Sequence, residues 1–198
     1  RGFFPVERLG TFRKLDGELS GHAEMRHVPG VDMSTGSLGQ GLSAAVGMAL
    51  AGKLSGKDYT TYAVLGDGEI AEGQIWEACM LAAARKLDNL SAILDSNKVQ
   101  LDGTVKEVLD TGDLAAKFES FGFYVQSIDG HDVAAVAEAV DKARACQGKP
   151  SMIIANTVKG KGVSFMEGNH AWHGKTPDEA QFAQAFEELE TALKGLEA

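Results

Sequence analysis

The chain has 198 residues, which is enough for one α/β domain with a substantial core but short for two domains. Hydrophobic residues make up 44% of the sequence and charged residues 24%, as in ordinary globular proteins, whereas the 24 glycines exceed the usual share. The formal net charge of −9 argues against nucleic acid as the main partner, because phosphate binding needs a basic surface.

Hydrophobic periodicity predicts helices and short strands that alternate along the chain after a loop-rich opening to about Thr35. The expected elements are a helix over 37–54, a strand over 61–65, a helix over 69–87, a strand over 91–95, a helix over 112–121, a strand over 123–128, a helix over 133–146, a strand over 151–156 and a last helix from 177. The apolar stripe expected on the second helix consists of Trp76, Met80, Ala83 and Leu87.

Two helix starts carry capping signals. Asp132 has the residue type and position of an N-cap for the helix over 133–146. The sequence Thr176-Pro177-Asp178-Glu179 predicts a capping box, with Thr176 as the N-cap and proline at the first helical position. The apolar stripe of that last helix consists of Phe182, Phe186, Leu189 and Leu193.

The alternation of strands and helices indicates the fold class. It predicts an α/β fold, with a parallel sheet covered by helices on both faces, in a single domain over residues 1–198. Residues 157–175 form a long loop, and loops of this length are more often functional than idle. The chain opens Arg1-Gly2-Phe3-Phe4-Pro5 without Met, so we expect an N-terminal part of the domain to be missing before residue 1.

Cysteine usage and hydropathy indicate the compartment. Cys79 and Cys146 lie far apart in helix-like segments, which favours two reduced thiols over a disulfide. No apolar run approaches the roughly 18 residues of a membrane span, and no signal-peptide pattern opens the chain. We therefore expect a cytoplasmic protein without a membrane partner.

The stretch LGDGEIAEG at 65–73 joins a strand to a helix, as phosphate-binding glycine turns do, but it is acidic. Asp67 follows one strand of a strand–helix–strand unit, and Asn97 follows the other. Because neighbouring parallel strands end at one edge of a sheet, these two side chains are expected to meet there. A carboxylate, a carboxamide and a nearby backbone carbonyl suit Mg²⁺ or Ca²⁺. The alternative is that Asp67 caps the following helix and Asn97 makes a turn.

Three other motifs do not support a site. GKLSGKD at 52–58 has one residue too few between its glycines for a Walker loop, and Asp58 stands where serine or threonine is needed. GSLGQG at 36–41 lacks the dinucleotide spacing and a preceding strand. His170 and His173 stand three residues apart, but no thiol or third histidine nearby completes a zinc site.

Four stretches together resemble one enzyme family. The segment from Gly66 to Asn97, which opens GDGEIAEG and ends ILDSN, is similar to the thiamine-diphosphate signature. Three more segments resemble transketolase in particular: GHAEMRHVPGVDMSTGSLGQGLSAAVGMA at 21–49, TVKGKGVSFME at 157–167 and HAWHGKTP at 170–177. The resemblance runs over nearly the whole chain and is to the diphosphate-binding domain, which some prokaryotes encode as a separate N-terminal subunit.

The resemblance implies residues for the cofactor and its metal ion. Asp67, Asn97 and the backbone carbonyl of Val99 would bind the divalent cation. The diphosphate would lie beside Gly66, Gly68 and the N-terminus of the following helix. The residues implied at the rest of the cofactor are Gly36 and Leu38 at its rings and His173 at the diphosphate side.

The resemblance also implies catalytic and interface residues. His22 would contact the ketose end of the substrate and, with His173, would be a catalytic histidine. Ala23 stands where the family usually has proline, which makes the loop around His22 less rigid. Glu72 aligns with an acidic residue at the interface between paired cofactor sites, and its alternative is a solvated glutamate that complements the helix dipole.

The activity implied by the resemblance is the transfer of a two-carbon ketol (glycolaldehyde) unit from a ketose phosphate to an aldose phosphate. The cofactors would be thiamine diphosphate and Mg²⁺ or Ca²⁺. No stretch of the chain resembles the pyrimidine-binding domain, which in this family supplies the glutamate that activates the cofactor. We therefore expect the partner to be a separate C-terminal subunit in a dimer of heterodimers, and we expect no transketolase activity from the isolated chain.

Two alternatives to this function remain. Another thiamine enzyme of the same superfamily, such as one that makes deoxyxylulose phosphate, would share the signature, although PGVDMSTGSLGQG favours transketolase. A non-catalytic remnant would hold the cofactor or only dimerise. The intact residues Asp67, Gly68, Asn97 and His173 argue against decay of the cofactor site.

Overall fold

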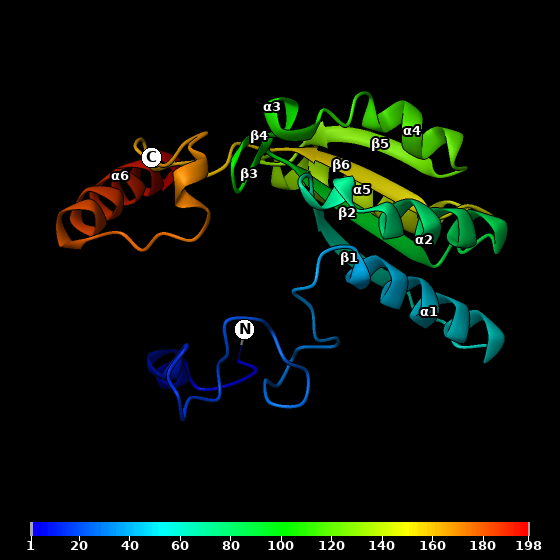
Figure 1. Ribbon diagram of the computed structural model, residues 1–198, viewed down its shortest axis with the longest axis horizontal. Coiled ribbons are helices and arrows are strands. Elements are labelled where there is room, and N and C mark those ends of the chain that lie inside the picture. Colours follow the sequence, from blue (N-terminus) through cyan, green and yellow to red (C-terminus); the bar gives the residue numbers. More distant parts are fainter. Residues whose placement is uncertain (1, 198) are drawn as a thin grey trace.

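A four-stranded parallel sheet forms the centre of the protein, in a computed structural model that describes residues 2–197. Its strand order is β1-β2-β6-β5 (Figure 1). The strands are β1 (Thr61–Gly66), β2 (Leu90–Ser96), β5 (Tyr124–Asp129) and β6 (Ser151–Asn156). The predicted α/β class is confirmed, and each predicted strand lies within one residue of the observed one at either end.

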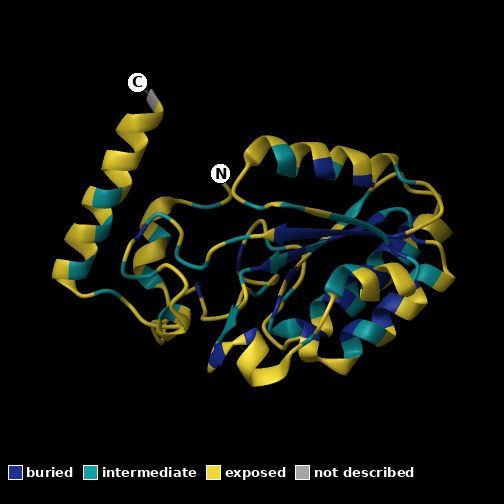
Figure 2. Ribbon diagram, turned by 90° about the horizontal axis from the view of Figure 1, so that it is seen from above, coloured by how far each residue is buried: buried dark blue, intermediate teal, exposed yellow. Residues whose placement is uncertain are grey.

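Helices cover both faces of the sheet. On one face, α1 (Gln40–Leu54), α2 (Gly73–Ala84) and α4 (Leu114–Ser120) enclose the larger core. On the other face lies α5 (Val133–Ala145). Successive residues of β2 point to opposite faces, so that Ala92 and Leu94 belong to the larger core while Ile93 packs under α5. Figure 2 shows the buried residues gathered in the strands and on the helix surfaces turned toward them.

The predicted helix over 69–87 is two elements. A single 3₁₀ turn, η2 (Glu69–Ala71), comes first, and α2 begins at Gly73 after Glu72 adopts an extended conformation. The predicted stripe is wrong at Met80, which is 55% exposed, whereas Trp76 packs against the larger core and Leu87, just after the helix, is fully buried. The buried residues of α2 itself are Ile75, Ala78, Cys79 and Ala82. The small side chains of Ala78, Cys79 and Ala82 let α2 pack closely against its neighbours.

Several short elements were not predicted from the sequence. The polar stretch after β2 folds into a hairpin of β3 (Val99–Gln100) and β4 (Gly103–Thr104). The helix α3 (Val105–Leu109) follows at once, with a capping box between Thr104 and Glu107. Two 3₁₀ helices, η1 (Val6–Thr11) and η3 (His170–His173), lie in the segments that flank the sheet region.

The last helix, α6 (Glu179–Glu197), begins two residues later than predicted. Its capping box is formed by Asp178 and Gln181: the Asp178 carboxylate accepts from Gln181 N–H at 2.9 Å, and the Gln181 side chain accepts from Asp178 N–H at 3.1 Å. The predicted N-cap Thr176 is therefore wrong, because Asp178 supplies the same type of acceptor nearer the first helical turn. In contrast, Asp132 caps α5 as predicted, by accepting from the N–H groups of Ala134 and Ala135.

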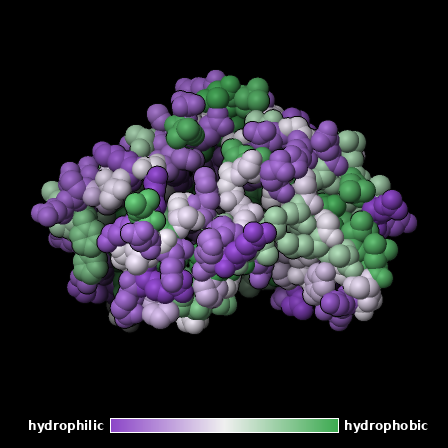
Figure 3. All heavy atoms as spheres, turned by 60° about the horizontal axis from the view of Figure 1, so that its bottom comes forward, coloured by the Kyte–Doolittle hydropathy of each residue, from purple (hydrophilic) through white to green (hydrophobic). Residues whose placement is uncertain are grey.

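The face of the molecule shown in Figure 3 is mostly polar, with apolar side chains in separate patches. One set of exposed apolar side chains is the stripe of α6, formed by Phe182, Phe186, Leu189 and Leu193. Within residues 2–197, no helix combines the length and apolar character that crossing a membrane requires. Cys79 and Cys146 are both free thiols, as expected, and burial raises the pKa of Cys79 to about 12.

Candidate functional site

Two neighbouring strands bring Asp67 and Asn97 to one edge of the sheet. Gly66 at the end of β1 pairs with Asp95 near the end of β2. Asp67 directly follows Gly66, and Asn97 comes two residues after Asp95. The two chain segments therefore lie side by side, and the backbone N–H of Lys98, next to Asn97, donates a hydrogen bond to the Asp67 carboxylate.

Asp67 is a buried carboxylate with 3% of its surface exposed. Burial raises the pKa of Asp67 above its usual value and the nearby Asp95 carboxylate raises it further, whereas hydrogen bonds from the N–H groups of Lys98 and Gly68 act in the opposite direction. A divalent cation would stabilise the charged form of Asp67 and offset its repulsion from Asp95. This environment fits a cation-binding carboxylate better than a helix cap, because η2 has no side-chain cap.

The orientation of Asn97 is fixed on both sides of its amide. Its Oδ1 accepts from the Val99 N–H at 3.0 Å, and its Nδ2 donates to Asp95 Oδ2 at 3.3 Å. Asp95 in turn accepts a hydrogen bond from the Thr157 hydroxyl, which follows β6. Asn97 thus keeps its carbonyl oxygen on the Val99 side of the loop, and a carboxamide oxygen retains a second lone pair for a cation.

Lys98 lies between the two expected metal ligands Asn97 and Val99 and has a left-handed backbone, with φ of +66°. This conformation is uncommon for a residue with a side chain. It lets the Lys98 N–H reach Asp67 while the Lys98 carbonyl accepts from Val105 N–H at 2.9 Å. The strained residue therefore directs the turn that carries Asn97 and Val99.

The two glycines beside Asp67 have different environments. A Cβ on Gly66 would meet no atom within 4 Å, so its face is open to a ligand. A Cβ on Gly68 would lie 2.8 Å from Gln100 Oε1 and 2.9 Å from Gln100 Cβ. Gly68 is therefore required by a contact within the chain. The expected N-terminus of a long helix is absent here, because a single 3₁₀ turn follows Gly68.

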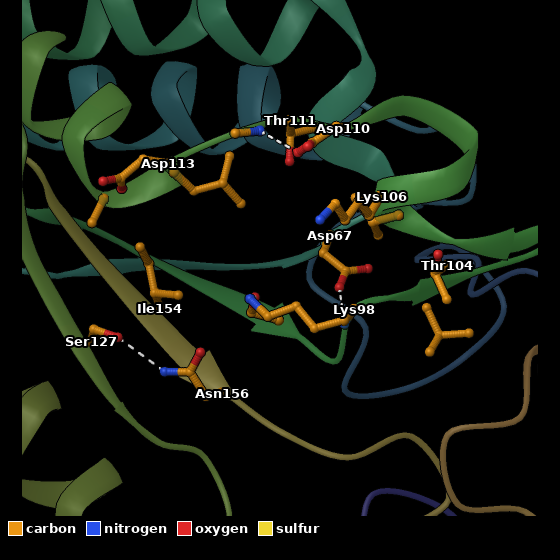
Figure 4. A pocket seen from close by; sticks show the side chains of 16 residues that line it. Asp67, Lys98, Thr104, Lys106, Asp110, Thr111, Asp113, Ser127, Ile154 and Asn156 are labelled. Carbon is orange, nitrogen blue, oxygen red and sulfur yellow. Dashed lines mark hydrogen bonds between the residues drawn. The ribbon is translucent and has the colours of Figure 1, made fainter.

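A cavity of about 620 Å³ opens beside Asp67 (Figure 4). Its charged lining mixes two lysines with three aspartates: Lys98, Lys106, Asp67, Asp110 and Asp113. Ser127, Ile154 and Asn156 come from the C-terminal halves of β5 and β6. The cavity leaves room for a ligand next to the carboxylate. Within residues 2–197 no group of three or more His, Cys, Asp or Glu side chains could hold a metal ion, so a cation here would need the amide and carbonyl oxygens as well.

The loop before α1 brings His22 and Gly36 into contact. Gly36 has φ of +138°, and a Cβ there would lie 2.7 Å from the Cγ and Cδ2 atoms of His22. The imidazole therefore packs against the glycine. Leu38, two residues after Gly36, has an apolar side chain that is 56% exposed. His22 and Leu38 are both accessible, as ligand contacts would require.

His173, the second predicted catalytic histidine, lies on η3, which packs against the hairpin that follows Asn97. The Nδ1 atom of His170 is 3.3 Å from the Leu101 carbonyl oxygen, and Asn169 caps the 3₁₀ turn. His173 is exposed at the end of the same turn. The structure thus brings the turn that bears His173 to the hairpin that begins at Val99.

Two residues near the site were not predicted. Asp95 orients Asn97, as described above. Glu69 accepts from Gly39 N–H at 2.8 Å and from Gly66 N–H at 3.1 Å, and so joins the two glycine-rich loops. Glu72, the predicted interface residue, is exposed at the junction of η2 and α2. The hydrogen bond between Gly39 and Glu69 joins residues 30 positions apart, and such a contact leaves no pattern in a single sequence.

Comparisons with known proteins agree on one family. The family described as "Transketolase, thiamine diphosphate binding domain" matches residues 2–192. The chain is 50% identical over 190 residues to the 6-deoxy-6-sulfo-D-fructose transketolase subunit SqwG of Clostridium sp., covering 96% of this chain and 69% of that protein. It is 44% identical over 188 residues to an apulose-4-phosphate transketolase subunit of Actinobacillus succinogenes, covering 95% and 68%.

Solved structures share the fold. The transketolase of Campylobacter jejuni superposes with a TM-score of 0.87 at 38% identity, covering 92% of this chain and 29% of that chain. A transketolase of Pichia stipitis in complex with sedoheptulose 7-phosphate gives a TM-score of 0.87 at 36% identity, covering 92% and 28%. The chain therefore spans less than a third of the length of these solved proteins.

Proposed function

We propose, from the premise that this chain belongs to the transketolase family and comprises its thiamine diphosphate binding domain, that it is one subunit of a transketolase. It would bind thiamine diphosphate through Mg²⁺ and act with a second subunit that carries the pyrimidine-binding domain. The reaction would transfer a two-carbon ketol unit from a ketose to an aldose. The observation that carries the proposal is the buried Asp67 held against the Asn97 turn at the ends of β1 and β2.

The residues at this edge suit a diphosphate bound through a cation. Asp67 and Asp95 would repel a bare diphosphate, and a divalent cation between carboxylate and phosphate would offset that repulsion. Asp67, Asn97 and the Val99 carbonyl would hold that cation, and the open face of Gly66 would admit the phosphates. Thiamine diphosphate, when bound, supplies the chemistry that breaks and remakes the bond next to a ketose carbonyl.

The remaining predicted residues would act on the substrate side. His22, held on Gly36, would donate a hydrogen bond to the ketose, and His173 would face the diphosphate side. Gly36 and Leu38 would provide a flat and apolar wall for the rings of the cofactor. Glu72, exposed at the start of α2, would contact a neighbouring subunit in a dimer of heterodimers.

The names of the relatives suggest the class of substrate. One relative is named for a sulfonated fructose and another for apulose 4-phosphate. Both names specify a ketose with an anionic group. We therefore propose that the donor is a ketose bearing a terminal phosphate or sulfonate. A panel of ketose phosphates and a sulfo-ketose, assayed with the partner subunit, would identify the donor.

Calorimetric titration tests the cofactor part of the proposal. Thiamine diphosphate should bind to the chain together with its partner in the presence of Mg²⁺, and binding should disappear when EDTA removes the cation. Absence of binding with Mg²⁺ would contradict the proposal and would favour a remnant that only dimerises. The reading frame next to this gene is the first place to look for the partner.

A further inference from the structure

We propose that Glu69 is a positioning residue that holds the loop of Gly36–Gly41 against the turn of Gly66-Asp67-Gly68. The inference rests on the proposed function, because these are the two loops assigned to the rings and to the diphosphate of the cofactor. Glu69 would not contact the reacting atoms. It would set the spacing between the two halves of the site.

The carboxylate of Glu69 joins the two loops directly. Its Oε1 accepts from Gly39 N–H at 2.8 Å, and its Oε2 accepts from Gly66 N–H at 3.1 Å. Both distances are those of good charge-assisted hydrogen bonds. Gly39 precedes α1 in a left-handed conformation with φ of +82° and cannot cap the helix with a side chain. Glu69 therefore anchors the backbone at the point where the loop turns into α1.

The surrounding contacts leave little slack in this arrangement. A Cβ on Gly39 would lie 3.1 Å from Glu72 Cβ, so the loop lies against the η2–α2 junction. Gln40 and Gln74 exchange hydrogen bonds at 2.6 and 3.2 Å, and Gln74 also donates to Ser43 at 2.8 Å. These polar contacts tie the start of α1 to the start of α2. Glu69 adds a contact to Gly66 at the end of β1 and so extends the connection to the cation edge.

The chemistry of the bridge requires a carboxylate of this length. Both donors are backbone N–H groups, so the residue must offer two acceptor oxygens. A glutamine offers one oxygen and would turn its NH₂ group toward the second N–H. An alanine offers none and leaves both donors without this partner. Use of both oxygens by N–H groups also reduces the negative potential that Glu69 presents to a nearby diphosphate.

The test measures loop order and cofactor binding separately in the full chain. Amide hydrogen exchange at Gly39 and Gly66, followed by NMR, reports the bridge without any cofactor. In Glu69→Ala we expect exchange at both amides to accelerate at least about tenfold, because each loses its acceptor. Titration of thiamine diphosphate with Mg²⁺, in the presence of the partner, should show a Kd raised about tenfold. Glu69→Gln, which keeps one acceptor, should protect one of the two amides and give an intermediate Kd.

The control and the contrary outcomes separate the two claims. Glu77→Ala removes an exposed glutamate from α2 and should change neither exchange at the two amides nor the Kd. Unchanged exchange in Glu69→Ala would overturn the bridge. Faster exchange with an unchanged Kd would overturn its role in positioning the site. Failure of the native protein to bind the cofactor would instead defeat the proposed function, while exchange at Gly39 would still report the bridge.

Discussion

The sheet region and the segments that flank it differ in how tightly they are packed. Residues 40–156 supply both hydrophobic cores, and each central strand contributes buried side chains. The flanking segments, residues 2–39 and 157–197, add the hydrophobic residues Leu19, Val28 and Val163 to the buried set. The two parts also hold different halves of the proposed site, since Asp67 and Asn97 belong to the sheet region and His22 and Leu38 to the flank.

This difference indicates which part of the site the chain can form by itself. The cation edge follows from strand pairing and from hydrogen bonds within the sheet region. The substrate side depends on His22 and Leu38, which are exposed and lie outside the two hydrophobic cores. We therefore expect the partner subunit to order the substrate side of the site.

The largest effect is expected from truncation in the core compared with truncation on α6. Leu42→Ala removes a fully buried side chain and should lower the free energy of unfolding by about 3 kcal/mol. Phe186→Ala removes a larger side chain that is 54% exposed and should cost less than about 1 kcal/mol in the isolated chain. Urea unfolding measures both. Equal losses would show that α6 belongs to the packed core.

Removal of the buried carboxylate should separate function from stability. Asp67→Ala should weaken binding of thiamine diphosphate in Mg²⁺ by at least about a hundredfold, because the cation loses its charged ligand. Asp141→Ala removes one negative charge from the exposed surface of α5 and serves as the matched control. Calorimetry of both variants with the partner subunit gives the comparison. Similar affinities for the two variants would contradict the assignment of Asp67.

A smaller effect is expected when the orientation of Asn97 is disturbed. Asp95→Ala removes the acceptor that fixes the Asn97 amide and should weaken cofactor binding by about tenfold. Thr157→Val removes the hydroxyl that holds Asp95 and should have a weaker effect in the same direction. The Mg²⁺ concentration for half-maximal cofactor binding is the measured quantity. A normal Mg²⁺ requirement in Asp95→Ala would show that Asn97 needs no such support.

The smallest effect concerns an ion pair within the sheet region. Asp88 accepts from Lys53 Nζ at 2.6 Å and from Gly148 N–H at 2.8 Å. Burial alone would raise the pKa of Asp88, but these partners outweigh it and lower the pKa below its usual value. A carboxyl group whose pKa is lowered by folding stabilises the folded chain at pH values above its pKa in the unfolded chain. This contribution disappears as the pH falls through the pKa of the group in the folded chain. Asp88→Asn should therefore cost about 1 kcal/mol at neutral pH and nothing in strong acid.

Unfolding of the native chain and of Asp88→Asn over a series of pH values checks the sign. The difference between the two should shrink as the medium becomes acidic. A difference that stays constant or grows toward low pH would mean that Asp88 is not held in its charged form by Lys53 and Gly148.

Much of the fold could be predicted because it depends on local patterns. Short apolar runs indicated the four strands, and the rule that parallel strands end together brought Asp67 to Asn97. Asp132 was a correct N-cap since its acceptor lies next to the donors that it serves. The predicted N-cap Thr176 was wrong because Asp178, two residues nearer the helix, has an equally suitable side chain, and only the geometry of the turn distinguishes the two.

The features that escaped prediction depend on residues far apart in the chain. The helix is interrupted between η2 and α2, where Glu69 accepts hydrogen bonds from the N–H groups of Gly39 and Gly66. Hydrophobic periodicity carries no information about such contacts. The left-handed Lys98 is held by Asp67 and Val105. Met80 was wrongly placed in the buried stripe of α2, because the helix buries Ala78, Cys79 and Ala82 beside its large residues and leaves Met80 exposed.

We propose that this chain forms the cation half of a transketolase site and needs a partner subunit for turnover. Ketol transfer should be measured with a ketose phosphate donor, an aldose acceptor, thiamine diphosphate and Mg²⁺, for the chain alone and for an equimolar mixture with the pyrimidine-binding subunit. We expect no turnover by the chain alone and turnover by the mixture. Turnover by the chain alone, or none by a mixture that binds the cofactor, would contradict this proposal.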